Sequence, residues 1–385
     1  MPWCRIDKTY TIGEITIAPV RRRDSESGLA PSILETIHKI LNGYKDIEGR
    51  PVSNFAILRY RDLDVLGDIT EEQFQIMNEN LQLACFAGLA NRAYFNSLGP
   101  YCNADCFMPY GQKFSGSGFT AIVSRRRDGR TWDTRQLSSV TFSMPVHVST
   151  VGQVILDKDL LSALVTFSTA ADPEEWLRWQ NAIACYNHAN TDSEAVQHQV
   201  EWVLLASAFE QILNADSTAK DVAEQFTQAM LPSSPILAGT TKRRSEQWKD
   251  PEKPLRYEWM REFYRLRGDF AHGKLKPKQP AVWNAQEHLV LASITFPLIV
   301  RCLLNKAGQY TISDKDRAEI NALESVADQQ FMERLSDERH SGDSLWSRAV
   351  EEANWEITHE KAVEFLERKG FFKNGPQSEG LTGPK

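Results

Sequence analysis

The sequence predicts an α+β N-terminal domain followed by an all-α bundle of helices. Segments rich in β-branched and aromatic residues at near period two are confined to about the first 150 residues. Beyond about Ser168 the pattern is helical and continues to near residue 370. A chain of 385 residues is also too long for a single small core. We therefore expect a mixed α/β domain over residues 1–165, a helical domain over 170–306, a C-terminal helical appendage over 307–373 and a disordered tail over 374–385.

The N-terminal domain is expected to alternate strands with two helices. The strand segments are 9–20, 54–60, 119–124 and 140–149. The turn signal Asp128-Gly129 predicts a hairpin after the third of them. One helix begins at Pro31 and stops at Asn42-Gly43, and the other begins at Thr70 with acidic residues in its first turn.

The second half of the chain reads as successive helices. Helical segments are expected over 172–190, 193–214, 218–231 and 281–308, and acidic helical segments follow from Ser313. Pro297 lies inside the segment 281–308 and should kink or break that helix, because proline lacks the backbone donor a helix needs.

The composition excludes several classes of protein. No window approaches the roughly 18 consecutive apolar residues of a membrane span, and the first residues lack a secretory pattern, so we expect a cytoplasmic protein. The six cysteines are too sparse for a disulfide framework. Cys102 and Cys106 form a CxxxC, but no second pair of ligands completes a zinc site of the usual spacing. The sequence predicts buried free thiols, with no metal and no cofactor.

The charge distribution is uneven. The net charge of −7 argues against a protein that coats nucleic acid by bulk electrostatics. Residues 242–278, however, hold twelve Lys and Arg against six Asp and Glu. This basic segment is either a local phosphate site or a solvated loop and helix face.

The segment 255–273 carries the most informative pattern. One helical stripe is apolar and belongs in the core: Trp259, Phe263, Leu266 and Phe270. The opposite side carries Arg261, Arg265 and His272. On an ideal helix Arg265 and His272 are about 20° apart, whereas Arg267 and His272 are roughly 140° apart. Asp269 is close enough in sequence to pair with Arg265 or with His272.

A purely structural interpretation of this segment exists. A histidine followed by glycine is common at a helix C-terminus, because a cation favours the negative end of the helix dipole and glycine adopts the left-handed cap.

The string "YRLRGDFAHG" resembles a known family. Arg267-Gly-Asp-Phe-Ala-His272 fits the R-x4-6-H pattern of the HEPN superfamily of helical ribonuclease domains. The longer string is similar to the signature of its Apea-like branch, to which Tyr264, Asp269 and Gly273 contribute. The upstream segment "LLASAFEQIL" resembles the helix that precedes the motif in that branch, and the resemblance covers roughly residues 170–306. Gly268 departs from the pattern, which commonly has a small polar residue there.

The resemblance implies a role for each residue. His272 would be the catalytic acid/base and Arg267 the phosphate clamp, although Arg265 also satisfies the spacing. Asp269 would orient His272 or Arg265, and Glu210 of the upstream helix would form a salt bridge with an arginine of the motif. The supporting residues are then Arg265, Asp269, Glu210 and Tyr264, and the cations expected to bind nucleic acid are Arg261, Lys274, Lys276 and Lys278.

These roles describe metal-independent cleavage of RNA to 2′,3′-cyclic phosphate ends. Histidine titrates near neutral pH, and arginine holds a phosphate bidentately. The family is known for composite sites in dimers, so the resemblance implies a homodimer, and its setting implies antiphage defence. The N-terminal domain would respond to a phage-derived or protein trigger. The alternative is a non-catalytic HEPN-type scaffold for RNA binding or dimerisation, in which the motif is inert.

Overall fold

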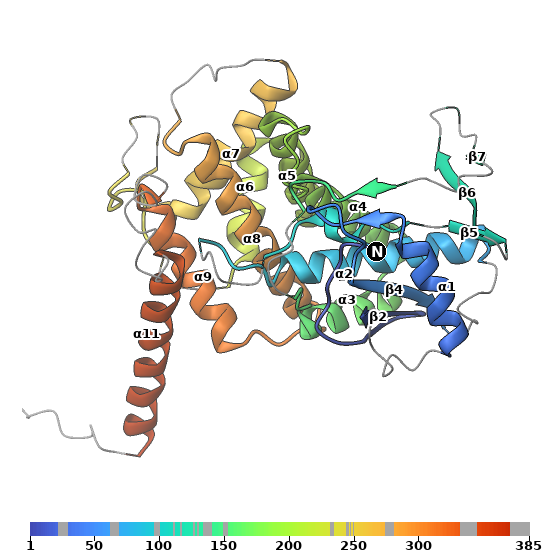
Figure 1. The fold of residues 1–385 in the computed structure, drawn as a ribbon. Coiled ribbons are helices and arrows are strands. Elements are labelled where there is room, and N and C mark those ends of the chain that lie inside the picture. Colours follow the sequence, from blue (N-terminus) through green and yellow to red (C-terminus); the bar gives the residue numbers. More distant parts are fainter. Residues whose placement is uncertain are drawn as a thin grey trace, which may run out of the picture.

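The computed structural model describes most of the chain (Figure 1). The described residues are 1–21, 30–61, 69–95, 101–110, 112–115, 118–125, 128, 131–133, 141–148, 153–231, 235–243, 246, 248, 250–273, 281–331 and 345–369. In this part of the chain all strands lie before residue 144, and the chain beyond is helical. The predicted order of a mixed α/β region followed by helices is therefore confirmed.

The main N-terminal sheet is an antiparallel set of three strands. It holds β1 (Tyr10–Ile12), β2 (Ile15–Arg21) and β4 (Asn54–Tyr60), in that order. The segment 9–20, expected as one strand, is thus a hairpin that turns at Gly13, whose φ of +53° suits glycine. The helix α1 (Pro31–Leu41) begins at its proline, as predicted, and lies beside this sheet in Figure 1.

Two smaller sheets complete the β structure. Strands β3 (Tyr44–Lys45) and β8 (Phe142–Ser143) pair in parallel. The strand expected over 140–149 is therefore only two residues within the described positions, and it ends before Pro145, which cannot donate to a sheet. Strands β5 (Gln112–Ser115), β6 (Gly118–Arg125) and β7 (Thr131–Asp133) form the third sheet, and the β6–β7 pairing confirms the predicted hairpin.

Helices α2 and α3 connect the sheets to the rest of the chain. Helix α2 (Glu71–Leu89) begins at Thr70 in a capping box with Gln73, as its sequence predicts. A short 3₁₀ helix, η1 (Ala104–Phe107), follows. Helix α3 (Lys158–Ala170), which the sequence pattern did not predict, is capped by Asp157. The expected domain limit at residue 165 lies inside this helix.

The helical part consists, in the described residues, of seven further helices. They are α4 (Pro173–Ala189), α5 (His198–Leu213), α6 (Ala219–Ala229), α7 (Leu255–Ala271), α8 (Ala285–Lys306), α9 (Asp314–Ala327) and α11 (Leu345–Arg368). Asp172 caps α4 and Ser313 caps α9 through side-chain hydrogen bonds, and each helix begins where the sequence places its start. The other predicted segments are confirmed with bounds shorter by a few residues. The expected tail over 374–385 lies outside the described residues.

Helix α8 runs through Pro297 without a break. Of the two outcomes expected at Pro297, a kink or a break, the break is wrong. Proline at 297 deprives the Ser293 carbonyl of its helical donor, four residues earlier. The Tyr186 hydroxyl of α4 donates to that carbonyl at 2.7 Å, and the Tyr186 ring stacks on Phe296 with 4.7 Å between ring centroids. A neighbouring helix thus replaces the missing hydrogen bond.

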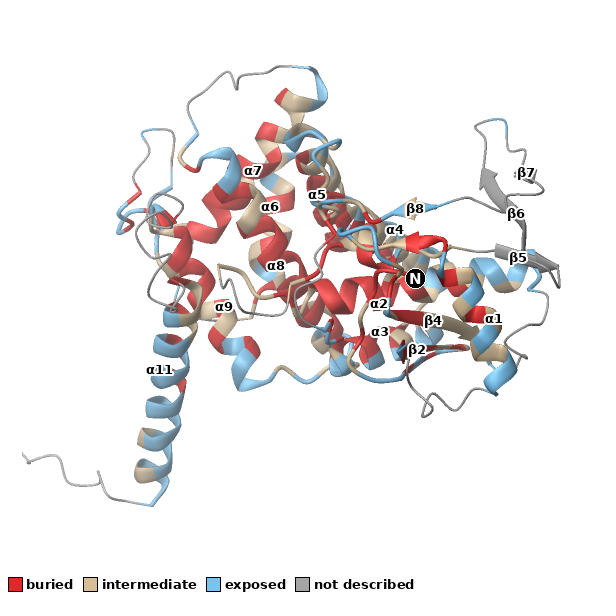
Figure 2. Cartoon of the chain, viewed as in Figure 1, coloured by how far each residue is buried: buried red, intermediate tan, exposed pale blue. Residues whose placement is uncertain are grey.

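One hydrophobic core extends from the sheets into the helices (Figure 2). Phe86 of α2 contacts Tyr186 of α4 and Phe296 of α8 edge-on, and Phe296 contacts Phe209 of α5 in the same way. Among the described helices, α8 alone is long and apolar enough to cross a membrane, and 78% of that stretch is buried. Its apolar residues therefore serve the core of the fold.

Helix α11 projects from this body (Figures 1 and 2). Its first half packs on α9 through Ala353 and Ile357, which contact Ala318. Between these two residues in sequence, Trp355 is 67% exposed and stacks on His359.

Candidate functional site

Helix α7 is held in the core by the apolar stripe that its sequence predicts. Trp259, Phe263 and Leu266 are buried, and Phe270 is half-buried. The Phe263 ring stacks on Trp202 of α5 with 5.2 Å between centroids, and the Trp202 indole donates to the Phe263 carbonyl at 2.9 Å. These contacts fix the rotation of α7 about its axis, and with it the direction in which each polar residue of the motif points.

His272 lies at the C-terminal cap of α7 and is exposed. Its backbone N–H donates to the Gly268 carbonyl at 3.2 Å, and Gly273 follows with a φ of +72°, the left-handed conformation that glycine adopts easily. Within the described residues, no hydrogen bond or ion pair engages the His272 imidazole. The backbone of the motif is therefore that of an ordinary helix end, while the imidazole faces solvent.

Arg267 is bound to helix α5 of its own chain. Its Nη2 lies 3.4 Å from Oε2 of Glu210, and its Nη1 donates to the Tyr264 hydroxyl at 3.1 Å. The same Glu210 oxygen accepts from the Tyr264 hydroxyl, and its other oxygen accepts from Ser217 at 2.6 Å. Burial, followed by the hydrogen bond to Glu210, raises the pKa of Tyr264 to about 12. The salt bridge expected of Glu210 is thus formed, and its arginine is Arg267.

Arg265 differs from Arg267 in its surroundings. It is half-buried, and within the described part of the chain no ion pair involves it. Its buried Nη2 has no hydrogen-bond partner among the described residues, as is also true of the Arg267 Nε. By its position on α7 it shares a face with His272, whereas Arg267 points to the face that meets α5. Asp269, between Arg265 and His272 in sequence, is buried at 9% exposure. Of the cations predicted to bind nucleic acid, Arg261 lies 2.7 Å from Glu258, and Lys274, Lys276 and Lys278 lie outside the described residues.

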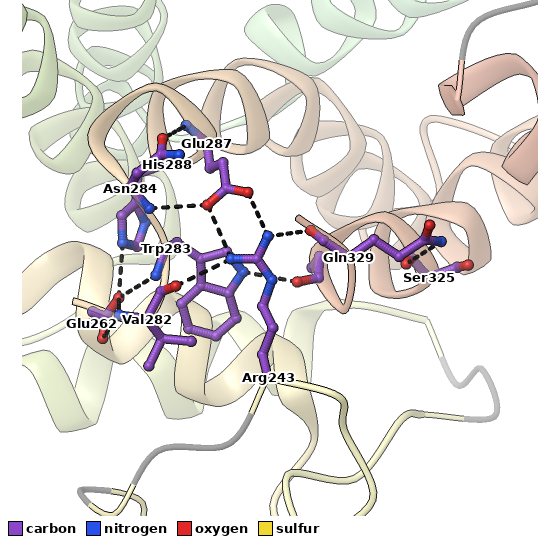
Figure 3. Close-up of polar contacts among 10 residues, drawn as sticks. Arg243, Glu262, Val282, Trp283, Asn284, Glu287, His288, Ser325 and Gln329 are labelled. Atoms are coloured by element: carbon purple, nitrogen blue, oxygen red, sulfur yellow. Dashed lines mark hydrogen bonds and ion pairs between the residues drawn. The ribbon is translucent and has the colours of Figure 1, made fainter. Parts of the chain in front are cut away.

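Two arginines of the basic segment are interior residues. Arg243 pairs with Glu287 and also donates to the Val282 carbonyl at 3.1 Å, and both members of the pair are buried (Figure 3). Arg256 pairs with Glu324 at 3.1 Å, again with both side chains buried. Their charges are neutralised inside the protein, so this part of the segment is neither of the two surfaces, phosphate site or solvated face, that its composition suggests.

A buried polar network that the sequence pattern did not predict joins α7 to the start of α8 (Figure 3). Glu262 accepts hydrogen bonds from the backbone N–H groups of Val282 and Trp283, at 2.9 and 3.1 Å, and lies 3.1 Å from Nε2 of His288. His288 is fully buried among the rings of Trp202, Trp259, Phe263 and Trp283. Burial lowers the pKa of His288 despite the neighbouring carboxylate. The sequence analysis identified neither the capping box of Asn284 and Glu287 nor the pairing of Glu287 with Arg243 over 44 positions.

The described residues contain no group of three or more His, Cys, Asp or Glu placed to hold a metal ion. The cysteines are free, and all except Cys185 are buried. Burial, followed by the neighbouring thiol of Cys106, raises the pKa of Cys102 to about 12. These thiols are part of the core, as predicted.

No protein-family model matches the chain, and neither the curated proteins nor the solved structures contain a match. The resemblance to the HEPN superfamily therefore depends on the residues of α5 and α7 themselves.

Proposed function

We propose that the protein is a metal-independent endoribonuclease of the HEPN type. The observation that carries the proposal is the exposed imidazole of His272 at the end of α7, on the face of the helix that also bears Arg265. An imidazole can both accept and donate a proton, so an exposed histidine can serve as an acid or as a base. A guanidinium can bind a phosphate bidentately, and Arg265, unlike Arg267, has no ion pair with a carboxylate in the described part of the chain.

The reaction needs no group beyond these side chains and the RNA. A base takes the proton of the 2′-hydroxyl, the 2′-oxygen bonds to phosphorus, and the bond from phosphorus to the 5′-oxygen breaks. An acid protonates the departing 5′-oxygen, which leaves a 2′,3′-cyclic phosphate and a 5′-hydroxyl. The arginine stabilises the charge that grows on the phosphoryl oxygens.

The contacts of Arg267 favour Arg265 as the phosphate clamp. Arg267 is held by Glu210 and Tyr264, so releasing it to a substrate would leave the Glu210 carboxylate without its cation. Arg267 then acts as a positioning residue that fixes α7 on α5. This assignment reverses the one that the resemblance alone implies, in which Arg267 is the clamp.

Each chain supplies a single His272, whereas the reaction uses both an acid and a base. A twofold-symmetric dimer duplicates every residue near its axis, so two α7 ends that face each other would provide both groups. We propose such a homodimer, with the N-terminal sheets as the part that responds to a trigger and antiphage defence as the setting. The role of the sheets and the setting rest on the resemblance alone.

The second candidate is a non-catalytic scaffold. The specific observation that favours it is the Arg267–Glu210–Tyr264 network, since a motif arginine bound within its own chain stabilises the fold without any substrate. In this alternative the histidine is a surface residue that ends a helix.

The test is digestion of total cellular RNA by the purified full chain in excess EDTA, with analysis of the 3′ ends of the products. The proposal predicts cleavage and 2′,3′-cyclic phosphate ends. Products with 3′-hydroxyl ends, or activity that appears only when divalent metal is added, would contradict it. Intact RNA, both alone and with lysate of phage-infected cells, would favour the scaffold.

A further inference from the structure

A cavity of about 400 Å³ lies beside the N-terminal half of α7. It is bounded by α6, by the residues that precede α7 and by one face of α7 itself. Its lining is strongly charged and comprises Lys220, Glu224, Asp250, Lys253, Tyr257, Glu258 and Arg261. Cavities of this size accept small molecules or single groups of larger ones.

Glu258 is the cavity residue that most clearly needs a hydrogen-bond donor from a ligand. The residue is 1% exposed, and its Oε2 lies 2.7 Å from Nη2 of Arg261 as an ion pair. Among the described residues, neither carboxylate oxygen has a partner that meets hydrogen-bond geometry. Burial raises the pKa of this carboxyl, and the charge of Arg261 opposes the rise. A buried carboxylate oxygen without a donor is costly, so a ligand that offers N–H groups to Glu258 would be strongly favoured.

Three cations line the cavity with Glu258, and two further carboxylates, Glu224 and Asp250, line it as well. The Lys253 ammonium lies 4.8 Å from the centre of the Tyr257 ring, and the Lys220 side chain is 76% exposed at 3.9 Å from Glu224. Lysines at a cavity rim bind phosphate as point charges without fixed geometry. The cavity therefore offers an acceptor for N–H donors within and positive charge for an anion outside.

We propose that this cavity binds a guanine nucleotide of the RNA substrate, with the N1–H and the 2-amino group of the base donating to Glu258 and the phosphate lying against Lys253 and Lys220. The proposal rests on the ribonuclease function proposed above. Single-stranded RNA is commonly recognised by hydrogen bonds to the Watson–Crick edge of an unstacked base.

The choice of guanine follows from the edge that each base presents. Guanine offers two adjacent N–H donors, which match the two oxygens of a carboxylate. Adenine and cytosine each place an unprotonated ring nitrogen beside their amino group, and it would face the lone pairs of Glu258. Uracil has one N–H between two carbonyl oxygens, which the carboxylate would repel.

The position of the cavity suits a substrate that reaches His272. Glu258, Arg261 and Arg265 follow one another at spacings of three and four residues, so they lie on the same face of α7 as His272. Fourteen residues of helix separate Glu258 from His272, which corresponds to about 21 Å. A few nucleotides of extended RNA span that length, so a base in the cavity would fix where the strand is cut.

Calorimetric titration of the full chain with GMP, IMP and AMP tests the base contact, because IMP lacks only the 2-amino group of guanine. We expect GMP to bind at least about tenfold more tightly than IMP or AMP. Glu258→Gln should weaken GMP binding at least about tenfold, since an amide offers a guanine only one acceptor. The matched control is Glu72→Gln, which removes an exposed carboxylate of α2 that does not line the cavity, and it should bind GMP within about twofold of wild type.

A second variant tests the proposal independently, in case Glu258→Gln does not fold. Lys253→Ala changes a residue that is not in the core, and it should weaken binding of GMP but not of guanosine, which has no phosphate. Absence of GMP binding by the wild type, equal affinity for GMP and AMP, or unchanged affinity in Glu258→Gln with wild-type folding would each overturn the proposal.

A final binding experiment tests whether the guanine that the cavity binds can be part of an RNA strand. His272→Ala should bind a single-stranded decamer with one guanosine more tightly than the same decamer with inosine at that position. Equal binding of the two decamers would overturn the assignment to substrate RNA, even if free GMP binds. If the ribonuclease function fails and the cavity is correct, GMP and the guanosine decamer still bind selectively. If the cavity is incorrect and the ribonuclease function is correct, Glu258→Gln cleaves the same positions as wild type.

Discussion

The Arg267 guanidinium lies 3.4 Å from the Glu210 carboxylate and so joins the motif helix α7 to α5. Both side chains are less than a third exposed, and Tyr264 contacts each of them. This relationship determines which arginine of the motif is available to a substrate, and it leads to the first two predictions.

We expect Arg267 and Glu210 to be energetically coupled. Alanine at either position should lower the free energy of unfolding, and the double mutant should lose about 1 kcal/mol less than the sum of the two single losses. Urea denaturation of the four proteins measures this coupling. The exposed pair Lys39 and Glu35 on α1 is the control, and its coupling should be close to zero. Additive losses at Arg267 and Glu210 would show that the contact does not hold α7.

We expect substitution of Arg265 to lower activity and substitution of Arg267 to lower stability. Arg265→Ala should reduce kcat/KM for RNA by about 100-fold or more with a small effect on stability, because it removes the cation from the phosphate. Arg267→Ala should act mainly through stability, as above. Cleavage assays and thermal melts of both variants provide the comparison. If Arg267→Ala is fully folded but does not cleave RNA, and Arg265→Ala remains active, then Arg267 rather than Arg265 is the phosphate clamp.

The buried His288 predicts a loss of stability in mild acid. Because burial lowers its pKa in the folded protein below the ordinary value near 6.5, the unfolded chain binds the proton more tightly. The stabilising contribution is complete above pH 6.5 and decreases as the pH falls toward the lowered pKa of the folded state. Glu262, Glu287 and Arg243 are the charged groups that face the ring.

The measurement is the free energy of unfolding from pH 7.5 to 5.5, for wild type and for His288→Phe. The phenylalanine suits the surrounding aromatic rings and cannot titrate. Wild type should lose about 1 kcal/mol more than the variant over this interval. Parallel curves would show that His288 does not titrate with folding.

Part of the contribution of the Tyr186 hydroxyl to stability should depend on proline at residue 297. Tyr186→Phe leaves the Ser293 carbonyl without a donor and should cost about 1–3 kcal/mol. In a Pro297→Ala background, the alanine N–H restores the helical bond, and the same change at Tyr186 should cost distinctly less. Denaturant unfolding of the four proteins tests this. An equal cost in both backgrounds would contradict the compensation.

Local signals predicted much of the fold. Thr70 with Gln73, Asp172 with Pro173, and Ser313 with Asp316 are caps that act over a few residues, and each begins a helix where the sequence places it. The apolar stripe of α7 was predicted for the same reason, since its 3.6-residue period reports the buried face directly.

Contacts between distant residues could not be predicted in this way. Judged from the neighbouring residues alone, Pro297 predicts a kink or a break in the helix. Only the position of Tyr186, 107 residues from Ser293, explains why α8 continues. The net charge of the segment 242–278 indicates an exposed basic surface, yet Arg243 and Arg256 meet carboxylates from later helices.

In the candidate site, helix geometry placed Arg265 beside His272, and the R-x4-H spacing favoured Arg267. The ion pair with Glu210 occupies Arg267. The cavity beside Glu258 is formed by α6, α7 and the residues before α7 together, so no single stretch of sequence reveals it.

The central claim is that His272 takes part in cutting RNA. Its most direct test compares wild type, His272→Ala and His198→Ala on one RNA in EDTA, with the initial rate of cleavage as the readout. His198 is the control because it is also an exposed histidine, at the start of α5, where it lies 3.1 Å from Glu201. We predict that His272→Ala cleaves at least about 100-fold more slowly while His198→Ala retains the wild-type rate. Cleavage by His272→Ala at the wild-type rate would contradict the claim.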